Sequence, residues 1–290
     1  MPDITIVSDL CKHCNTCAEA CPEGVFAIGE KRTTPRVARP DLCISCGHCV
    51  ALCANGAIRH SDFPPGSVRP IAKDLLPNTD TLMELLRARR SGRVFNNTPV
   101  PKEHLEKIIE AARLAPTGHN FQGTQYIVVQ DPALLKHITD LTAAFLGQSA
   151  KLLRNPVIRG LYGIIKPIEV KSAMKMLDCF EIAAKSGRDG RDKILRGAPC
   201  LLFLHADPAL AYPDKSAQLA VQNASLMCET LGLMSLYTGF IVGACDHGIK
   251  IPELIGVPKH HRVCAALAIG YSKFTFHHWI DRKPAPVQWK

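Results

Sequence analysis

The sequence has no segment typical of a membrane-spanning or exported protein. Its longest run without a charged residue or a histidine, 230–245, has 16 residues, whereas a helix needs about 20 apolar residues to cross a bilayer. Residues 1–10 carry two aspartates and no basic residue, which is the wrong start for a secretory signal. We therefore expect a cytoplasmic protein without a transmembrane segment, whose cysteines serve metal or redox chemistry rather than disulfide bonds.

The sequence also lacks the signatures of several common functional classes. No Ser-His-Asp or Cys-His arrangement indicates hydrolysis or acyl transfer, and no glycine fingerprint for a dinucleotide is present. The formal net charge of +9 permits nucleic-acid binding, but no pattern of aromatic and basic residues supports it, so we expect none. Hydrophobic residues make up 47% of the 290, which is enough to bury the core of one large domain or two modest ones.

Cysteine is abundant by contrast, and most of it follows one repeated spacing. Eight of the 13 cysteines lie in two copies of C-x2-C-x2-C-x3-C that are 32 residues apart. Three closely spaced thiolates can surround one iron–sulfur cluster, while the fourth ligates the other cluster. C-x2-C pairs also bind zinc, but two runs of four leave more close thiolates than a zinc site uses. The expected ligands are Cys11, Cys14, Cys17 and Cys53 for the first cluster, and Cys43, Cys46, Cys49 and Cys21 for the second.

Through these two runs, residues 1–60 resemble the bacterial two-cluster [4Fe-4S] ferredoxins. The first run ends Cys21-Pro22, as in that family, whereas the second ends Cys53-Ala54, a change that removes no ligand. We therefore predict a 2[4Fe-4S] ferredoxin-like domain over 1–60. Prolines interrupt any regular element between 61 and 80, so we interpret that stretch as a linker.

Helical and strand-like patterns are mixed after the linker. Apolar residues at three- and four-residue steps predict helices at 81–90, 101–114 and 216–231. Short apolar runs predict strands at 126–129, 200–204 and 263–269. This mixture indicates an α+β or α/β domain over 81–290, and periodicity alone does not choose between the two.

Two segments of this domain carry polar groups suited to a flavin or nucleotide. The sequence R-R-S-G-R at 89–93 places three guanidinium groups at the end of a helix, where they can grip a phosphate. Alone, such a basic helix end is more often simply solvated. Residues 115–122 form a turn whose Asn120 and Gln122 amides can reach a polyol or a ring edge, although such a loop can also satisfy only its own backbone.

Together, these segments resemble the nitroreductase-like flavin reductases, which carry R-x-S-x-R/K-x-F followed by P-S-x-x-N-x-Q. Later stretches at 196–199, 237–240 and 282–284 agree with that family. The resemblance implies an α+β protein: a small two-cluster ferredoxin-like module followed by a nitroreductase-like α/β sandwich, with a central mixed sheet flanked by helices. It also implies a homodimer with FMN sites built from both chains, and helix 216–231 suits such an interface.

The same resemblance implies which residues bind FMN, and we assign no catalytic side chain. The arginines and serine of 89–93 would hold the phosphate together with Arg282. Thr238 and Gly239 would offer backbone groups near the flavin N5, and Asn120 would bond the ribityl chain or the ring edge. The full set is Arg89, Arg90, Ser91, Arg93, Pro116, Thr117, Asn120, Gln122, Thr238, Gly239 and Arg282.

These cofactors predict an FMN-dependent oxidoreductase that converts one-electron into two-electron chemistry. A [4Fe-4S] cluster carries one electron, and FMN takes one or two. We expect electrons to pass from a one-electron donor through two [4Fe-4S] clusters to FMN, and on to an electron-poor organic acceptor such as a nitroaromatic or a quinone. A ferredoxin, a flavodoxin or NAD(P)H is a candidate donor. Two alternatives stay open: a dehalogenase-type reaction on the same fold, and an electron carrier that serves a protein partner.

A basic segment without a counterpart in these motifs occupies about 145–195. Residues 151–196 hold 11 Lys and Arg against five acids, with apolar patches at 157–165 and 174–182. Pro156 and Pro167 argue against a single long helix. We expect a solvated helical hairpin that covers the site. The alternatives are a lid that sets substrate choice, a landing face for an acidic donor, and a membrane-surface patch.

Overall fold

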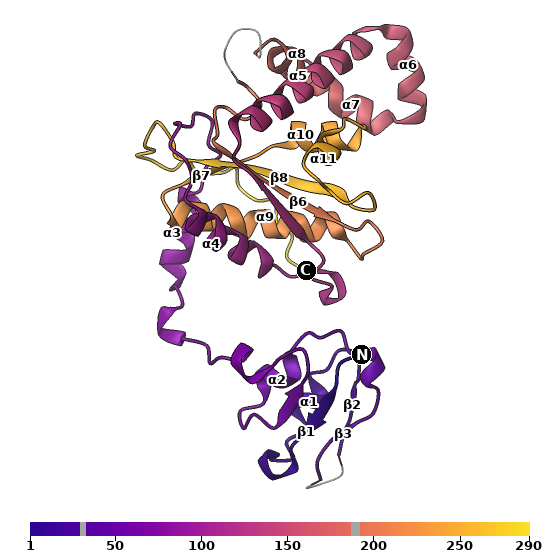
Figure 1. The fold of residues 1–290 in the computed structure, drawn as a ribbon, viewed down its shortest axis with the longest axis vertical. Coiled ribbons are helices and arrows are strands. Elements are labelled where there is room, and N and C mark those ends of the chain that lie inside the picture. Colours follow the sequence, from indigo (N-terminus) through magenta and orange to yellow (C-terminus); the bar gives the residue numbers. More distant parts are fainter. Residues whose placement is uncertain (30–32, 187–191) are drawn as a thin grey trace. The chain divides into compact units, whose positions relative to one another are not determined.

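The computed structural model describes residues 1–29, 33–186 and 192–290 (Figure 1). It divides the chain into two compact units, one formed by Met1–Pro77 with His119–Phe121, and one formed by Asn78–Gly118 with Gln122–Lys290. None of the helices in the described ranges is long and apolar enough to span a membrane. Part of the basic segment, including Arg188, Asp189 and Arg191, lies outside the described residues.

The first unit consists of two halves that repeat at the 32-residue offset of the cysteines. The strands of each half pair with the strands of the other half, because β1 pairs antiparallel with β4 and β2 pairs antiparallel with β3. The two halves therefore share one small core around Val25, Phe26 and Ile58. The elements are β1 (Ile4–Ile6), η1 (Ser8–Leu10), α1 (Thr16–Glu19), β2 (Phe26–Ala27), β3 (Arg36–Val37), η2 (Pro40–Leu42), α2 (His48–Leu52) and β4 (Ile58–His60), followed by the 3-10 turns η3 (Pro65–Ser67) and η4 (Lys73–Leu75).

A four-stranded sheet in the order β5-β6-β8-β7 forms the centre of the second unit. All neighbouring strands in it are antiparallel, and a parallel bridge from Ser91 to Ser235 adds to the outer edge of β7. Every residue of β6 is buried, which explains why this strand reads as a continuous apolar run rather than an alternating one. The strands are β5 (Gln125–Val129), β6 (Cys200–Ala206), β7 (Met234–Tyr237) and β8 (Arg262–Gly270).

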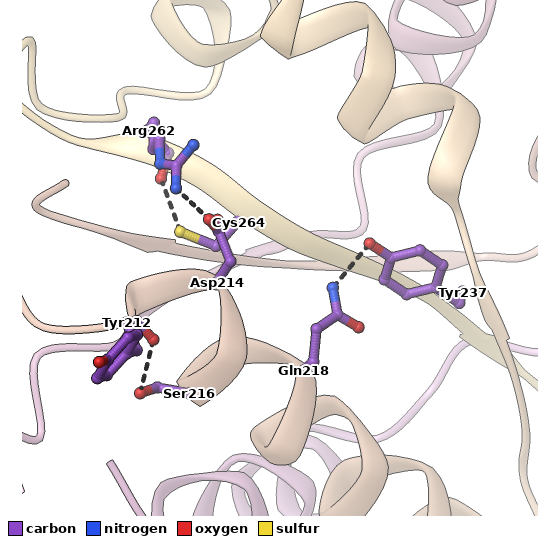
Figure 2. Close-up of polar contacts among 7 residues, drawn as sticks. All are labelled: Tyr212, Asp214, Ser216, Gln218, Tyr237, Arg262 and Cys264. Carbon is purple, nitrogen blue, oxygen red and sulfur yellow. Dashed lines mark hydrogen bonds and ion pairs between the residues drawn. The ribbon is translucent and has the colours of Figure 1, made fainter. Parts of the chain in front are cut away.

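Helices cover both faces of this sheet (Figure 1). Because side chains alternate along a strand, Leu201 and Phe203 of β6 join the core beneath α5 and α10, while Leu202 and Leu204 join the core beneath α4 and α9. An ion pair between Arg262 of β8 and the start of α9 also ties that helix to the sheet (Figure 2). The helices are α3 (Thr79–Ala88), α4 (Lys102–Arg113), α5 (Pro132–Arg154), α9 (Pro213–Thr230), α10 (Gly239–Asp246) and α11 (Ile251–Leu254).

The face of helix α9 that carries small residues packs against the sheet of the same chain. Ala217, Ala220 and Ala224 are almost completely buried and pack in the core with the sheet. This face is covered by the sheet of the same chain, whereas Leu219 on another side of the helix is 47% exposed; the role of α9 in a dimer interface stays a prediction. The sequence patterns also miss α5 and β7, although α3, α4, α9, β5, β6 and β8 lie within a few residues of the predicted ranges.

The basic segment forms three short helices: α6 (Pro156–Ile165), α7 (Pro167–Lys175) and α8 (Leu177–Ser186). Pro156 and Pro167 occupy first helical positions, where a missing N–H costs nothing. Arg154 at the end of α5 forms ion pairs with Asp178 and Glu181 of α8, at 3.4 and 2.8 Å. Helix α5 continues unbroken to Arg154, so a segment starting near 145 begins inside this helix.

A buried histidine pair makes the stability of the second unit depend on pH. His205 of β6 is 3% exposed, and its Nδ1 lies 2.9 Å from Nδ1 of His261. Burial and the neighbouring His261 lower the pKa of His205. Below about pH 6.5 this histidine is protonated more readily in the unfolded chain than in the folded chain. Its full contribution to the free energy of unfolding is therefore present above about pH 6.5, and the free energy of unfolding falls as the pH drops toward the lowered pKa.

We expect His205→Gln to flatten this dependence. The melting temperature of the wild type should fall from about pH 7 to pH 5, and that of the variant should fall less. The exposed residue His137 provides the control, because His137→Gln should keep the wild-type slope. Equal slopes in all three proteins would contradict the assignment.

Candidate functional site

The cysteine turns of the first unit repeat in backbone geometry as well as in sequence. His13 and Asn15 have φ of +56° and +58°, and their counterparts 32 residues on, Ser45 and Gly47, have φ of +50° and +75°. Residues other than glycine rarely adopt this left-handed region. Alternating left-handed residues curl each C-x2-C-x2-C segment into a tight loop, and the same strained loop is built twice.

Hydrogen bonds to sulfur repeat in the same way. The N–H groups of His13 and Ser45 each donate to the cysteine two residues before them, at 3.4 Å in both halves. The N–H groups of Val25 and Ala57 each donate to the last cysteine of their run, at 3.3 and 3.2 Å. Such donors stabilise thiolates and tune iron–sulfur potentials. Hydrogen bonds from Thr16 likewise lower the pKa of Cys14.

Cys21 of the first run lies with three cysteines of the second run. Together they line a cavity of about 20 Å³. Burial, together with a smaller effect of the neighbouring thiols of Cys46, Cys43 and Cys21, raises the pKa of Cys49 to about 11. Four thiolates can share so small a space only when a cationic metal core compensates their charge. This grouping is the one that the crossed ligand assignment requires for the second cluster.

The donor set of this unit fits a cluster better than a single ion. Within the described ranges, no three Cys, His, Asp or Glu side chains converge on one metal-ion position. In a [4Fe-4S] site each cysteine sulfur binds a different iron atom. The four cysteine sulfurs therefore lie farther apart than the four ligands of a single metal ion. His60 adds a polar contact, with Nε2 3.4 Å from the Cys43 sulfur.

In the second unit, the arginine-rich segment 89–95 runs along the outer edge of β7. Ser91 bridges to Ser235, and the Gly92 N–H donates to the Ser235 carbonyl at 2.9 Å. A side chain at Gly92 would place its Cβ 2.6 Å from the Phe95 ring, so the close approach requires glycine. Phe95 is buried and anchors the segment, which leaves the polar side chains before it at the strand edge.

The cations of this segment are not neutralised by ion pairs. Among the residues that the structure describes, no salt bridge or hydrogen bond engages the guanidinium groups of Arg89, Arg90 or Arg93. Burial raises the pKa of Glu229, and the positive charge of Arg89 only counteracts this. Arg282 lies in the exposed C-terminal tail, where its N–H donates to the Asp281 carboxylate at 2.7 Å; no described contact joins it to the other arginines. Arg89, Arg90 and Arg93 lie within five consecutive residues, and three such cations would suit a dianionic phosphate. Their convergence on one ligand stays a prediction.

Tyr237, Thr238 and Gly239 lead from β7 into α10. Thr238 is buried, and both its N–H and its hydroxyl donate to the Ala266 carbonyl, at 2.9 and 3.0 Å. Thr238 thus holds the turn in place, and among the described residues the first turn of α10 leaves the N–H groups of Gly239 and Phe240 as donors for a ligand. Figure 2 shows the Tyr237 ring reaching Gln218 of α9, whose amide donates to the phenol oxygen at 2.9 Å.

The predicted flavin loop after α4 lies at the opposite edge of the sheet. It begins at the exposed Pro116 and leads into β5, and its Thr117 hydroxyl accepts the N–H of Gln122 at 3.0 Å. Three strands separate β5 from the segment at Ser91, a distance of about 19 Å at the usual strand spacing. One chain therefore does not bring the two groups of predicted FMN residues together.

Asn120 of this loop makes its side-chain hydrogen bonds within the first unit. His119–Phe121 group with the first unit, where the Asn120 amide donates to the carbonyls of Ile44 and Ser45 at 3.1 and 2.7 Å. His119, Asn120 and Gln122 all have left-handed φ, between +47° and +55°. Such clustered strain is typical of functional loops. The contact of Asn120 with the flavin stays a prediction.

A cavity of about 1060 Å³ opens beside the Tyr237–Gly239 turn, between α5, α10 and the helices of the basic segment. The turn lies three residues along β7 from the Ser91 bridge, or about 10 Å, a gap that the five-carbon ribityl chain of a flavin can span. The wall is mainly apolar, with contributions from Leu152, Ile158, Tyr162, Val170, Met176, Phe180 and Phe240.

Arg196 also lines this cavity and was absent from the predicted site. The Asp192 carboxylate fixes its loop by accepting three N–H groups, those of Ile194, Leu195 and Gly197, at 2.8, 3.0 and 3.1 Å. Arg196 and Gly197 have φ of +60° and +78°. The Arg-Gly pair was the sequence signal that could have indicated this turn, because glycine is the residue best suited to a left-handed backbone position.

Comparison with known proteins identifies both units. The family model described as "Nitroreductase family" matches residues 86–271. The chain belongs to this nitroreductase family. A second model, described as "4Fe-4S dicluster domain", matches residues 10–58. The protein is thus a nitroreductase-family FMN-dependent oxidoreductase with an N-terminal ferredoxin-like domain, and the expectations for its fold class and cofactor chemistry are confirmed at that level.

Relatives of this nitroreductase have different names. NADH dehydrogenase of Thermus thermophilus is 29% identical over 197 residues, 68% of this chain and 88% of that protein. Iodotyrosine deiodinase 1 of Rattus norvegicus is 38% identical over 212 residues, 73% of this chain and 67% of that protein. The crystal structure of an FMN-bound nitroreductase from Bacteroides fragilis aligns with 72% of this chain and 96% of that chain, with a TM-score of 0.51 and 18% identity, and thus shares its fold.

The grouped arginines predict the effect of removing one of them. We expect Arg93→Ala to weaken FMN binding by roughly 10- to 100-fold, because charge-assisted bonds to a phosphate contribute about 1.5–3 kcal/mol. Flavin release on dilution, followed by fluorescence, measures the affinity. The matched control is Lys107→Ala, which removes an exposed cation of α4 and should leave the affinity unchanged. Equal FMN affinities for the two variants would show that Arg93 does not bind the phosphate.

Proposed function

We propose that this nitroreductase accepts single electrons at two [4Fe-4S] clusters and delivers them through FMN to an electron-poor organic acceptor, such as a nitroaromatic or a quinone. What carries the proposal is the combination, in one chain, of two repeated cysteine turns with an arginine-rich segment and a cavity along β7. When bound, FMN supplies the exchange between one- and two-electron steps, and the clusters supply single electrons.

The residues of the chain bind and orient these groups. The two cysteine turns would each hold three irons of one cluster, and the N–H groups directed at sulfur would stabilise the thiolates. Arg89, Arg90 and Arg93 would hold the FMN phosphate at the Ser91 end of β7, and the Gly239 N–H would contact the flavin ring at the other end. The tie between Thr238 and Ala266 orients that N–H.

A second copy of the chain would complete the flavin site. The loop with Pro116, Thr117 and Gln122 lies at the β5 edge, whereas the arginines lie beyond β7. Both groups can reach one FMN if the β5-edge loop comes from a second copy, as a twofold dimer provides. This supports a homodimer with two flavin sites, each built from both chains.

The cavity beside Gly239 is the proposed acceptor site. Its volume of about 1060 Å³ is at the upper end for small-molecule sites, so it would admit a multi-ring compound. Its largely apolar wall favours a planar organic acceptor over a small inorganic one. Arg159 and Arg196 at the wall would favour acceptors that carry negative charge.

Reductive dehalogenation is the second candidate reaction. It is supported by the 38% identity to a protein named iodotyrosine deiodinase 1. Halide release from iodinated and brominated phenols, measured beside the reduction of nitroaromatics and quinones by the same preparation, separates the two. The acceptor with the highest kcat/KM decides the assignment.

Replacing a cluster ligand tests the electron path. Cys14→Ala should abolish reduction of FMN by a one-electron donor, such as reduced ferredoxin, because the first cluster loses a ligand. FMN that is reduced chemically should still reduce the acceptor. Cys179→Ala is the control, because Cys179 is an exposed cysteine outside the two runs, and it should retain both activities.

Other outcomes contradict the proposal in distinct ways. Survival of ferredoxin-dependent reduction in Cys14→Ala would show that the clusters are bypassed. Stoichiometric zinc without iron in the purified protein would exclude the clusters. If chemically reduced protein is reoxidised only by another protein, the chain is an electron carrier rather than a reductase of small molecules.

A further inference from the structure

Helix α6 and the start of α7 present an apolar face to solvent. Four of its side chains, at 157, 161, 164 and 165, follow the spacing of one helix face. Their exposed fractions are high for aliphatic residues: 69% for Val157, 60% for Leu161, 80% for Ile164, 76% for Ile165 and 84% for the adjoining Ile168. These five residues are called the α6 face below.

The side of α6 next to the α6 face lines the cavity. Ile158 and Tyr162, about a quarter turn around the helix, form part of the cavity wall. The α6 face itself is covered by nothing in the described parts of that unit. Exposed aliphatic residues in one contiguous patch are typical of an interaction surface rather than of a solvated helix.

The charges around the α6 face are almost all positive. Residues 141–168 contain no Asp or Glu, and residues 151–175 hold six Lys and Arg against one acid, Glu169. Glu169 pairs with Lys166 at 2.9 Å, and Arg154 pairs with two acids of α8. Lys171 and Lys175 remain as exposed cations and share one face of α7 with Ile168, at steps of three and four residues. Aliphatic residues at the centre and cations around them match the boundary between the acyl chains and the anionic headgroups of a lipid surface.

We propose that the α6 face docks on an anionic membrane surface, with the axis of α6 parallel to the membrane plane. A second copy of the chain is a poorer occupant, because a twofold contact would set these cations against their own copies. An acidic protein would satisfy the cations but not five aliphatic side chains. The proposal is independent of the flavin reaction.

Vesicle binding by the intact holoprotein tests the proposal. We expect co-sedimentation with vesicles that contain phosphatidylserine and little binding to pure phosphatidylcholine vesicles. The double variant Ile164→Ser and Ile165→Ser should have a partition coefficient between vesicles and water that is lower by roughly tenfold or more. The reason is that several methylene groups per side chain no longer insert into the lipid surface. Lys171→Gln with Lys175→Gln should reduce the preference for phosphatidylserine.

Matched controls keep the result interpretable. Leu114 is 67% exposed at the end of α4, and Leu114→Ser should bind vesicles like the wild type. All replaced residues are exposed, so melting temperatures should agree among the variants. Equal binding of the Ile164/Ile165 variant and the wild type would overturn the proposal, as would absence of binding to phosphatidylserine vesicles. A fall in sedimentation coefficient for the Ile164/Ile165 variant without lipid would show instead that a second copy covers the α6 face.

Discussion

The pairing of β6 with β8 is the contact on which the second unit depends. These two strands are the most deeply buried elements, and their register sets Leu202 against Leu267 and Phe203 against Ala266. Alternate residues then face α5 and α10 on one side and α4 and α9 on the other. Because β8 also pairs with β7, the same register fixes the edge at which Ser91 and the Tyr237–Gly239 turn are held. The proposed flavin site is therefore a consequence of how two central apolar strands align.

Exchange between repeats has a similar role in the first unit. Each half is too small to bury a core alone, and its strands pair with those of the other half. This strand pairing brings Cys21 of the first half close to the cysteines of the second run. Each half therefore contributes both core residues and cluster ligands to the other. Loss of one cluster would then remove a ligand-bearing contact between both halves, which couples metal binding to the folding of the whole unit.

Prediction from the sequence succeeded where the signal is local. The cysteine spacing and the fully apolar runs of β6 and β8 each report a property of a few consecutive residues. It gave no sign that the alanine face of α9 packs on the sheet of its own chain. It also gave no sign that the N–H and hydroxyl of Thr238, which it assigned to the flavin site, donate to the carbonyl of Ala266, 28 residues away. Hydrogen bonds between distant segments leave no local pattern.

The sequence by itself determined the chemistry that the chain can hold: two runs of four thiolates, a cluster of three guanidinium groups, and a basic segment with exposed aliphatic residues. Residue type and spacing suffice for this, because ligand identity is a local property. Only the tertiary structure decided which groups meet. It placed the arginines and the Pro116 loop at opposite sheet edges, directed Arg196 into a cavity through Asp192, and left the α6 face uncovered. The physical reason is that strand order and helix packing are set by burial across the whole unit, which no short stretch of sequence records.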